Sequence, residues 1–445
     1  MFAKALRVAL GAVLVVVAAL VGYLWIAPPN LLKVGTNYAA KIVCSNVFLA
    51  GRDAQEVLAL DVQAPGHPLL KQVSVSVDES AGQVTARVFG FAAPAVSQYR
   101  PGLGCTNLHD ATLSPASLPM LAAPGEEVWP QGNAVTLSQD PKLVQAMTDP
   151  ALLGEGYRAA LVVHRGQIIA ESYADGFDAD TPLLGWSMTK TLVAALFGTL
   201  EQAGLVSRDM DLTSSYPDWA QDDRADITLA DMLAMSSGLG WNEGYGDVSD
   251  VTRMLYLVDD MAGFAASQPL VAPVGTDFIY SSGTSTALSR VMQNLAGDDN
   301  LSYPQGALFA PLGMSSAVLE TDATDTFVGS SYMYATARDW ARFAQFLLQG
   351  GQWDGQALLP EGYTDWMFAP APASDGLYGK GQIWIESPGE RPPFEDAVWM
   401  QGHDGQFIGI FPSRDLIVLR MGLTPSRLDY SSLPLAQAII AALDG

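Results

Sequence analysis

The order of apolar and polar residues along the chain predicts strands in three places. In residues 73–88, valine and alanine alternate with polar residues on both sides of a DESAG turn, which is typical of a β-hairpin. Residues 158–173 predict two short strands joined by a turn, and residues 407–423 predict two antiparallel strands around a Pro-Ser-Arg-Asp turn. Strands are therefore expected near both ends of the region that follows residue 126.

Helical spacing of apolar residues occurs between and after these strands. An apolar stripe in residues 188–204 predicts a helix that Gly204 ends, and residues 338–351 and 433–445 predict two more helices. Most of the segment between these first two helices is also helical by pattern, with long polar loops. We therefore expect an α+β fold, in which an antiparallel sheet flanked by helices accompanies a mostly helical subdomain.

The longest apolar stretch lies near the beginning of the chain. The run from Val8 to Ala27 contains no charged residue, and as a helix it would be about 30 Å long, enough to cross a bilayer. Lys4 and Arg7 precede this run and should stay in the cytoplasm, so the remaining chain should lie outside it. We expect a single-pass anchor in the cell inner membrane, with the rest of the chain in the periplasm or outside the cell. The alternative is a cleaved signal peptide and a secreted protein, although the residues after Trp25 form a poor cleavage site.

The region after the anchor differs in composition from the rest of the chain. It contains the first β-hairpin and ends in a stretch rich in proline, serine and glycine. We predict three parts: an anchor at 1–33, a small N-terminal β-containing region at 34–125 and a larger domain at 126–445. In an oxidising compartment Cys44 and Cys105 can form a disulfide, which would stabilise the fold by about 4 kcal/mol. The alternative is two buried free thiols.

Composition limits the classes of partner. The formal net charge is −24, so the phosphates of nucleic acid or an anionic membrane surface would be repelled. Charged residues make up 16% of the chain and hydrophobic residues 49%, which excludes general disorder. The four histidines and two cysteines lack metal-ligand spacing, so we expect neither a metal ion nor another cofactor.

The start of the helix at residue 188 carries a candidate nucleophile and base. Ser187 and Lys190 are three residues apart, so their side chains should share one helix face. A serine hydroxyl needs a base to remove its proton, and a lysine can serve if burial and nearby positive charge lower its pKa. No other lysine of the chain has a serine three residues before it. The alternative is that Ser187 only caps the helix and Lys190 is solvated.

A second proton-transfer group is expected at Tyr280. It follows a Pro-x-Gly turn and a short apolar piece, and it precedes Ser281, Ser282 and another predicted helix. A cationic lysine nearby would lower the pKa of the phenol, which could then accept a proton and return it to the leaving group. The alternative is a core tyrosine, with Ser282 as a helix cap.

The third candidate stretch is GHDGQ at residues 402–406. Glycines flank His403-Asp404 directly before an apolar strand, so the backbone can approach a ligand closely. The amide of Gln406 could then stabilise an oxyanion together with the amide of Ser187. The alternative is a hairpin turn that carries a solvated histidine.

Together these motifs resemble the serine β-lactamase-like and penicillin-binding superfamily. The resemblance is strongest to class C type β-lactamases, esterases of that fold and 6-aminohexanoate-dimer hydrolase, and it covers about residues 130–445. Two further segments carry it: ITLADMLAMSSGLGWNE at 227–243 and GSSYMYATARDWARFAQFLLQGG at 329–351. The resemblance implies a β-lactamase-like sheet with flanking helices. Trp241 and Glu243, at the end of the first of these segments, are candidates to line the pocket without a mechanistic role.

The resemblance also implies a role for each motif residue. Ser187 would be the acylated nucleophile, Lys190 and Tyr280 would share proton transfer, and the amides of Ser187 and Gln406 would form the oxyanion hole. Substrate contacts are expected from three residues: Ser282, His403 and Gly405. Ser282 stands where relatives often have asparagine, and His403 stands where β-lactamases have a carboxylate-binding lysine.

Because a neutral imidazole binds a carboxylate less well than lysine does, we expect a hydrolase for a small-molecule ester, amide or peptide-like substrate without an obligatory carboxylate. Two alternatives stay open. One is a D-Ala-D-Ala carboxypeptidase or β-lactamase, and the other is a non-catalytic protein of the same fold that binds cell-wall fragments.

Overall fold

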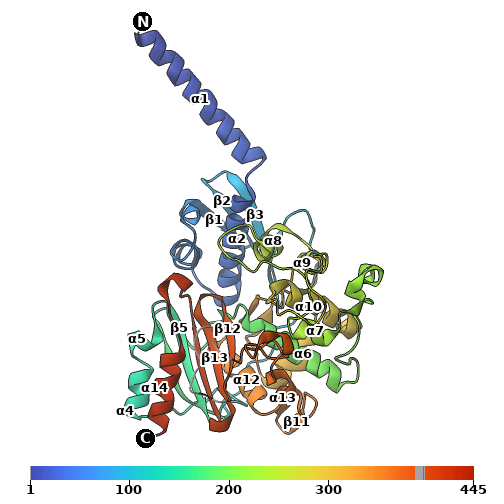
Figure 1. Cartoon of the computed structure of the whole chain (residues 1–445). Coiled ribbons are helices and arrows are strands. Elements are labelled where there is room, and N and C mark those ends of the chain that lie inside the picture. Colours follow the sequence, from blue (N-terminus) through green and yellow to red (C-terminus); the bar gives the residue numbers. More distant parts are fainter. Residues whose placement is uncertain (1, 386–393, 395) are drawn as a thin grey trace. The chain divides into compact units, whose positions relative to one another are not determined.

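The computed structural model describes residues 2–385, 394 and 396–445, and these form two compact units. The first unit comprises residues 1–99, 105–112 and 244–259, and the second comprises residues 100–104, 113–243 and 260–445. Figure 1 shows the elements of both. Residues 244–259 therefore pack with the N-terminal region, although their place in the sequence is inside the predicted larger domain.

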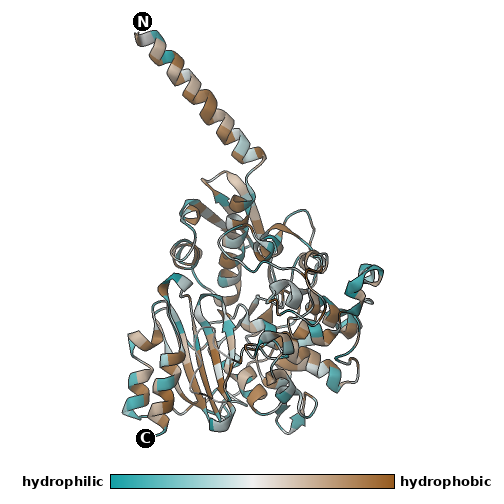
Figure 2. Ribbon diagram, viewed as in Figure 1, coloured by the Kyte–Doolittle hydropathy of each residue, from teal (hydrophilic) through white to brown (hydrophobic). Residues whose placement is uncertain are grey.

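The first unit begins with the predicted apolar helix. Helix α1 (Phe2–Ile26) is exposed along its length, and residues Lys4–Ile26 are long and apolar enough to cross a membrane. Figure 2 shows it as almost wholly hydrophobic. Helix α2 (Asn30–Ala50) begins directly after Pro28-Pro29 and ends at Gly51, whose left-handed backbone (φ 62°) suits a helix C-cap.

The predicted hairpin of the first unit is present within a four-stranded sheet. Its strands follow the order β1 (Val73–Asp78), β2 (Gln83–Val88), β3 (Ala92–Arg100) and β4 (Gly104–Leu108). A disulfide joins Cys44 of α2 to Cys105 of β4, so the predicted pairing is present. Helix α8 (Asp250–Leu257) packs on α2, where the rings of Tyr38 and Tyr256 meet edge to face at 5.8 Å.

The second unit is built around the predicted antiparallel sheet. Five strands follow the order β12 (Val398–Gly402), β13 (Gln406–Phe411), β14 (Leu416–Gly422), β5 (Tyr157–His164) and β6 (Gln167–Tyr173). Every neighbouring pair is antiparallel. The sheet thus joins strands from the beginning and the end of this unit, which confirms the predicted arrangement.

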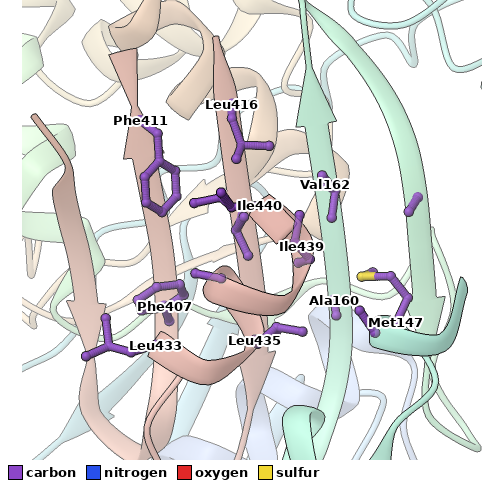
Figure 3. Close-up of a cluster of buried hydrophobic side chains, with 14 of the residues drawn as sticks. Met147, Ala160, Val162, Phe407, Phe411, Leu416, Leu433, Leu435, Ile439 and Ile440 are labelled. Atoms are coloured by element: carbon purple, nitrogen blue, oxygen red, sulfur yellow. The ribbon is translucent and has the colours of Figure 1, made fainter. Parts of the chain in front are cut away.

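Helices cover both faces of this sheet. On one face lie α4 (Pro141–Ala146), α5 (Pro150–Leu153) and α14 (Leu433–Leu443), whose apolar side chains form a buried cluster with those of the strands (Figure 3). Helix α12 (Ala337–Leu348) packs against β5, β13 and β14. Successive side chains of a strand point to opposite faces of the sheet, so the apolar residues of these strands cover both faces and each face packs on one layer of helices.

The helical part of the second unit positions the motif residues. Helix α10 (Ser282–Ala296) packs against α6 (Met188–Gln202), α7 (Leu229–Leu233) and α9 (Met261–Ala266). A small sheet has the order β7 (Leu183–Leu184), β9 (Met333–Ala335), β8 (Val318–Leu319), and its strand β7 lies directly before α6 in the chain. The remaining α-helices and strands of the described residues are α3 (Ala54–Val57) in the first unit and α11 (Ala310–Leu312), α13 (Tyr363–Phe368), β10 (Gln352–Trp353) and β11 (Gln356–Ala357) in the second.

Candidate active site

Ser187 lies at the junction of β7 and α6. The amide of Gly185 donates to the carbonyl of Met333 in β9 at 2.9 Å, which fixes the chain before the helix. Trp186 then has a left-handed backbone (φ 48°), an unfavourable conformation for a bulky residue. Ser187 follows as the N-cap residue of α6, but its side chain makes no capping hydrogen bond. The interpretation of Ser187 as an ordinary cap is therefore wrong, and its hydroxyl is available to other partners.

The expected contact between Ser187 and Lys190 is present. The Nζ of Lys190 donates to the Oγ of Ser187 at 2.9 Å, to the Oγ of Ser282 at 3.0 Å and to the carbonyl oxygen of Ser330 at 3.0 Å. The Lys190 side chain is 0% exposed, so the alternative of a solvated lysine is wrong. Three acceptors from three separate segments hold the amino group.

Burial changes the protonation of this lysine. Desolvation lowers the pKa of Lys190 to about 8, and the negative charge of Glu243 opposes part of this shift. A substantial fraction of the amine is then neutral near pH 8, as a general base requires. The predicted direction of the shift is confirmed, and its cause is burial.

Tyr280 completes the group of three expected residues. Ser281 caps α10 by accepting from the amide of Thr284 at 2.9 Å, so the cap is Ser281 and not Ser282, and Tyr280 lies just before the helix. The ring centre of Tyr280 is 4.9 Å from the Nζ of Lys190, which places the phenol beside the amine.

The expected lowering of the Tyr280 pKa is wrong. Desolvation and the nearby charge of Glu243 raise the pKa of this phenol, and the interaction with the Ser187 side chain offsets only part of the rise. The sequence could not reveal this, because it shows neither the burial nor the carboxylate beside the ring. Tyr280 is a protonated phenol at neutral pH and is suited to donate a proton.

Aromatic rings surround Tyr280. The rings of Trp384 and Tyr378 lie 5.3 and 5.8 Å from that of Tyr280, and the ring of Phe278 lies 5.2 Å from that of Tyr378. Phe278, Tyr280 and Trp384 are partly exposed. This wall is apolar and suits an uncharged portion of a ligand.

Glu243 is a site residue whose part the sequence analysis missed. Its Oε1 accepts from the Oγ of Ser282 at 2.5 Å, and its Oε2 accepts from the amide of Ser282 at 2.9 Å and from the Nε1 of Trp241 at 2.5 Å. Trp241 rests on Gly283, where a Cβ atom would overlap its ring. Glu243 and Ser282 are 39 residues apart, so no local spacing signals their contact.

His403 lies in the turn between β12 and β13. The segment His403–Gly405 forms a single 3-10 turn, with left-handed backbone at Asp404 (φ 58°) and Gly405 (φ 82°). The imidazole of His403 packs edge to face on Trp186 at 5.5 Å between ring centres, which places it beside the residue that precedes Ser187. The hairpin of the alternative interpretation is present, and the histidine contacts Trp186 while 36% of its side chain stays exposed to solvent.

Gln406 begins β13 and pairs with Gly402 of β12. Its side chain bonds β14, because Nε2 donates to the carbonyl of Gly422 at 2.5 Å and Oε1 accepts from the amide of Gly422 at 3.0 Å. Gly402 in turn lies so close to the carbonyl of Gly185 that a Cβ atom would overlap it. The backbone of β12 is therefore next to the segment that leads into Ser187, while the oxyanion role of the Gln406 amide stays a prediction.

A cavity of about 520 Å³ adjoins this turn. Its lining includes His403, Asp404, Asp429 and Tyr430, and neither lysine nor arginine belongs to that lining. Ser187, Lys190 and Tyr280 do not line it. Within the described ranges, no group of three His, Cys, Asp or Glu side chains is arranged to hold a metal ion.

Comparisons with known proteins agree with this geometry. The family model described as Beta-lactamase matches residues 155–427. The 6-aminohexanoate-dimer hydrolase of Paenarthrobacter ureafaciens is 24% identical over 291 residues, which cover 60% of this chain and 72% of that protein.

Solved structures share the fold at low identity. A putative 6-aminohexanoate-dimer hydrolase from Bacillus anthracis has a TM-score of 0.54 at 21% identity, over 65% of this chain and 79% of that one. A family VIII carboxylesterase has a TM-score of 0.56 at 15% identity, over 70% of this chain and 98% of that one.

Proposed function

Because this chain belongs to the beta-lactamase family, whose model matches residues 155–427, we propose that it is a serine hydrolase that cleaves an ester or amide bond through an acyl-enzyme on Ser187. One observation carries the proposal: the buried amine of Lys190 lies 2.9 Å from the hydroxyl oxygen of Ser187. A buried lysine whose pKa is lowered to about 8 can take the proton of an adjacent hydroxyl.

In the proposed acylation step, each motif residue has a distinct role. Neutral Lys190 accepts the Ser187 proton while Oγ bonds to the substrate carbonyl carbon, and the amides of Ser187 and Gln406 stabilise the oxyanion. The phenol of Tyr280 gives its proton to the leaving oxygen or nitrogen as the bond to the carbonyl carbon breaks. The proton held by Lys190 then restores the phenol. In deacylation, water replaces the leaving group and Lys190 is again the base.

The proposed substrate is a small-molecule ester or amide that needs no carboxylate. Two observations support this class: His403 stands where a carboxylate-binding lysine is expected, and the aromatic wall at Tyr280 is uncharged. The names of the relatives include an amide-dimer hydrolase and a carboxylesterase, which fit the same class. Ser282 is buried and bonded to Lys190 and Glu243, so in this proposal it acts beside the base rather than against the substrate.

The test is active-site labelling. The full chain is treated with a fluorophosphonate, and the adduct is mapped by peptide mass spectrometry. We expect a single adduct on Ser187 and none in Ser187→Ala. A folded wild-type protein that stays unlabelled at Ser187 contradicts the proposal and favours the non-catalytic binding protein.

A substrate panel then separates the enzyme classes. We expect turnover of p-nitrophenyl esters or amides, dependent on Ser187, and little turnover of nitrocefin. Rapid hydrolysis of nitrocefin or of D-Ala-D-Ala peptides would instead indicate a β-lactamase or carboxypeptidase.

A further inference from the structure

The partners of the Lys190 amine differ in what they can donate. The carbonyl oxygen of Ser330 can only accept a hydrogen bond. The hydroxyl of Ser282 has one proton, and that proton is directed to the carboxylate of Glu243, whose Oε1 lies 2.5 Å away and can only accept when ionised. Ser282 therefore offers Lys190 only its lone pairs. Of the three partners, only Ser187 is left with a hydroxyl proton to donate.

This arrangement fixes the direction of the neutral amine. A neutral –NH2 group has two N–H bonds and one lone pair. The two N–H bonds match the two obligatory acceptors, Ser330 O and Ser282 Oγ, each 3.0 Å from Nζ. The lone pair is then directed to Ser187 Oγ at 2.9 Å, which is the geometry that proton removal requires.

We propose that Glu243 is a positioning residue for acylation: it holds the Ser282 proton and thereby aims the lone pair of neutral Lys190 at the Ser187 hydroxyl. The inference rests on the proposed function. Glu243 itself is held in place, because its Oε2 accepts from the Ser282 amide and from Trp241 Nε1.

The substitution Glu243→Gln tests this direction with little change of shape. The position of Oε2 receives two N–H donors, so the carbonyl oxygen of glutamine must occupy it. The glutamine –NH2 then faces Ser282 and donates to its oxygen. The Ser282 proton is displaced toward Nζ, where it competes with Ser187 for the lone pair of Lys190.

The measured quantity is the second-order rate of fluorophosphonate labelling of Ser187 as a function of pH. We expect Glu243→Gln to lower the high-pH rate about 10- to 100-fold, less than the 10²–10⁴-fold typical of losing a base. Its pH midpoint should also move below that of wild type, because the charge that favours protonated Lys190 is gone. Tyr280, which lies beside this lysine, and Tyr378, which lies beside Tyr280, are uncharged phenols in this range.

A double-mutant cycle separates positioning from structural damage. If Glu243 acts through Ser282, Glu243→Gln should add little to the rate loss of Ser282→Ala, which we expect to be about 10-fold or more. Independent effects that multiply would overturn the proposal. A Glu243→Gln midpoint that moves upward would also overturn it, since that indicates hydration of Lys190 rather than loss of a charge.

Matched controls are available on the same helices. Ser285→Ala removes a buried hydroxyl of α10 that bonds Gln382 Oε1 at 2.7 Å, and Glu201→Gln removes a carboxylate of α6 that pairs with Arg208. Both should label at the wild-type rate with the wild-type midpoint. If Glu243→Gln does not fold, Ser282→Ala decides alone, and an unchanged rate contradicts the proposal.

Failure of this proposal is distinguishable from failure of the proposed function. If wild-type protein labels at Ser187 and Lys190→Ala slows this labelling by about 10²–10⁴-fold, the proposed serine hydrolase stands even if the effects of Glu243→Gln and Ser282→Ala multiply. If wild-type protein does not label at Ser187, both the proposed function and the positioning role of Glu243 are contradicted.

Discussion

At the scale of single residues, the site depends on what burial does to two ionisable groups. Desolvation lowers the pKa of Lys190 and raises that of Tyr280, because the charged form is the cation in one case and the phenolate in the other. The same environment thus favours a neutral lysine and a protonated tyrosine, which are the forms that the proposed mechanism requires. Opposite shifts in neighbouring groups are typical of acid–base pairs in enzymes.

A pH profile follows from the lysine. Only neutral Lys190 accepts a proton, so the labelling rate of Ser187 should rise with pH and level off above a midpoint near 8. Lys190→Ala should lower the plateau by about 10²–10⁴-fold and abolish this rise. The measurement is the labelling rate between pH 6 and 10, with circular dichroism to check folding. A pH-independent wild-type rate would remove Lys190 from the base role.

The residue scale also shows the limits of spacing as a signal. A spacing of three residues at the start of one helix is enough to predict the contact of Ser187 with Lys190, because helix geometry is local. The bond of Glu243 to Ser282 depends on a loop and a helix start that approach each other in space. No periodicity links them, and the sequence therefore placed Glu243 only at the pocket wall.

At the scale of elements, the active site depends on how closely β12 approaches the start of α6. Gly402 touches the carbonyl of Gly185, and the Trp340 ring lies where a Cβ atom of Gly185 would be. Neither glycine has a left-handed backbone, so what excludes a larger residue is the close approach. These two contacts hold the turn before Ser187 between strand β12, which contains Gly402, and helix α12, which contains Trp340.

The substitution Gly402→Ala tests this approach. Its methyl group would overlap the Gly185 carbonyl, so β12 or the turn before Ser187 must shift, at a cost of about 1–3 kcal/mol in the free energy of unfolding. Labelling of Ser187 should slow at the same time. Gly306→Ala is the control, because nothing lies within 4 Å of its added Cβ atom. Equal labelling and stability in both variants would show that the contact does not position the turn.

At the scale of the whole molecule, the two units share a discontinuous chain. The chain enters the first unit directly after Glu243 and returns to the second at Asp260. Between these points α8 packs on α2, and the carboxylate of Asp259 accepts from the amides of His109, Asp110 and Ala111 at 3.0–3.1 Å. The N-terminal region is thus the packing partner of a segment from the middle of the sequence, and removing it would leave α8 without that support.

The location of the molecule depends on α1. An exposed apolar helix of this length is stable in a bilayer, and the residues before it favour a cytoplasmic N-terminus. We expect the protein to stay in the membrane fraction after a carbonate wash, with an uncleaved N-terminus by mass spectrometry. Recovery of a soluble exported form that begins after Ala27 would instead identify α1 as a signal peptide.

By itself, the sequence determined several elements of each unit and their order along the chain, but not α2, β3, β4 or the small sheet of β7, β9 and β8. The alternating hairpin in 73–88, the strand pairs in 158–173 and 407–423, the helix that follows Ser187 and the apolar N-terminal run are all indicated by local pattern, and the structure contains each of them. Tertiary structure alone decided the chemistry of the site. The burial of Lys190, the raised pKa of Tyr280 and the hydrogen bonds of Ser282 depend on side chains from distant segments that meet in space, and a linear pattern does not encode such contacts.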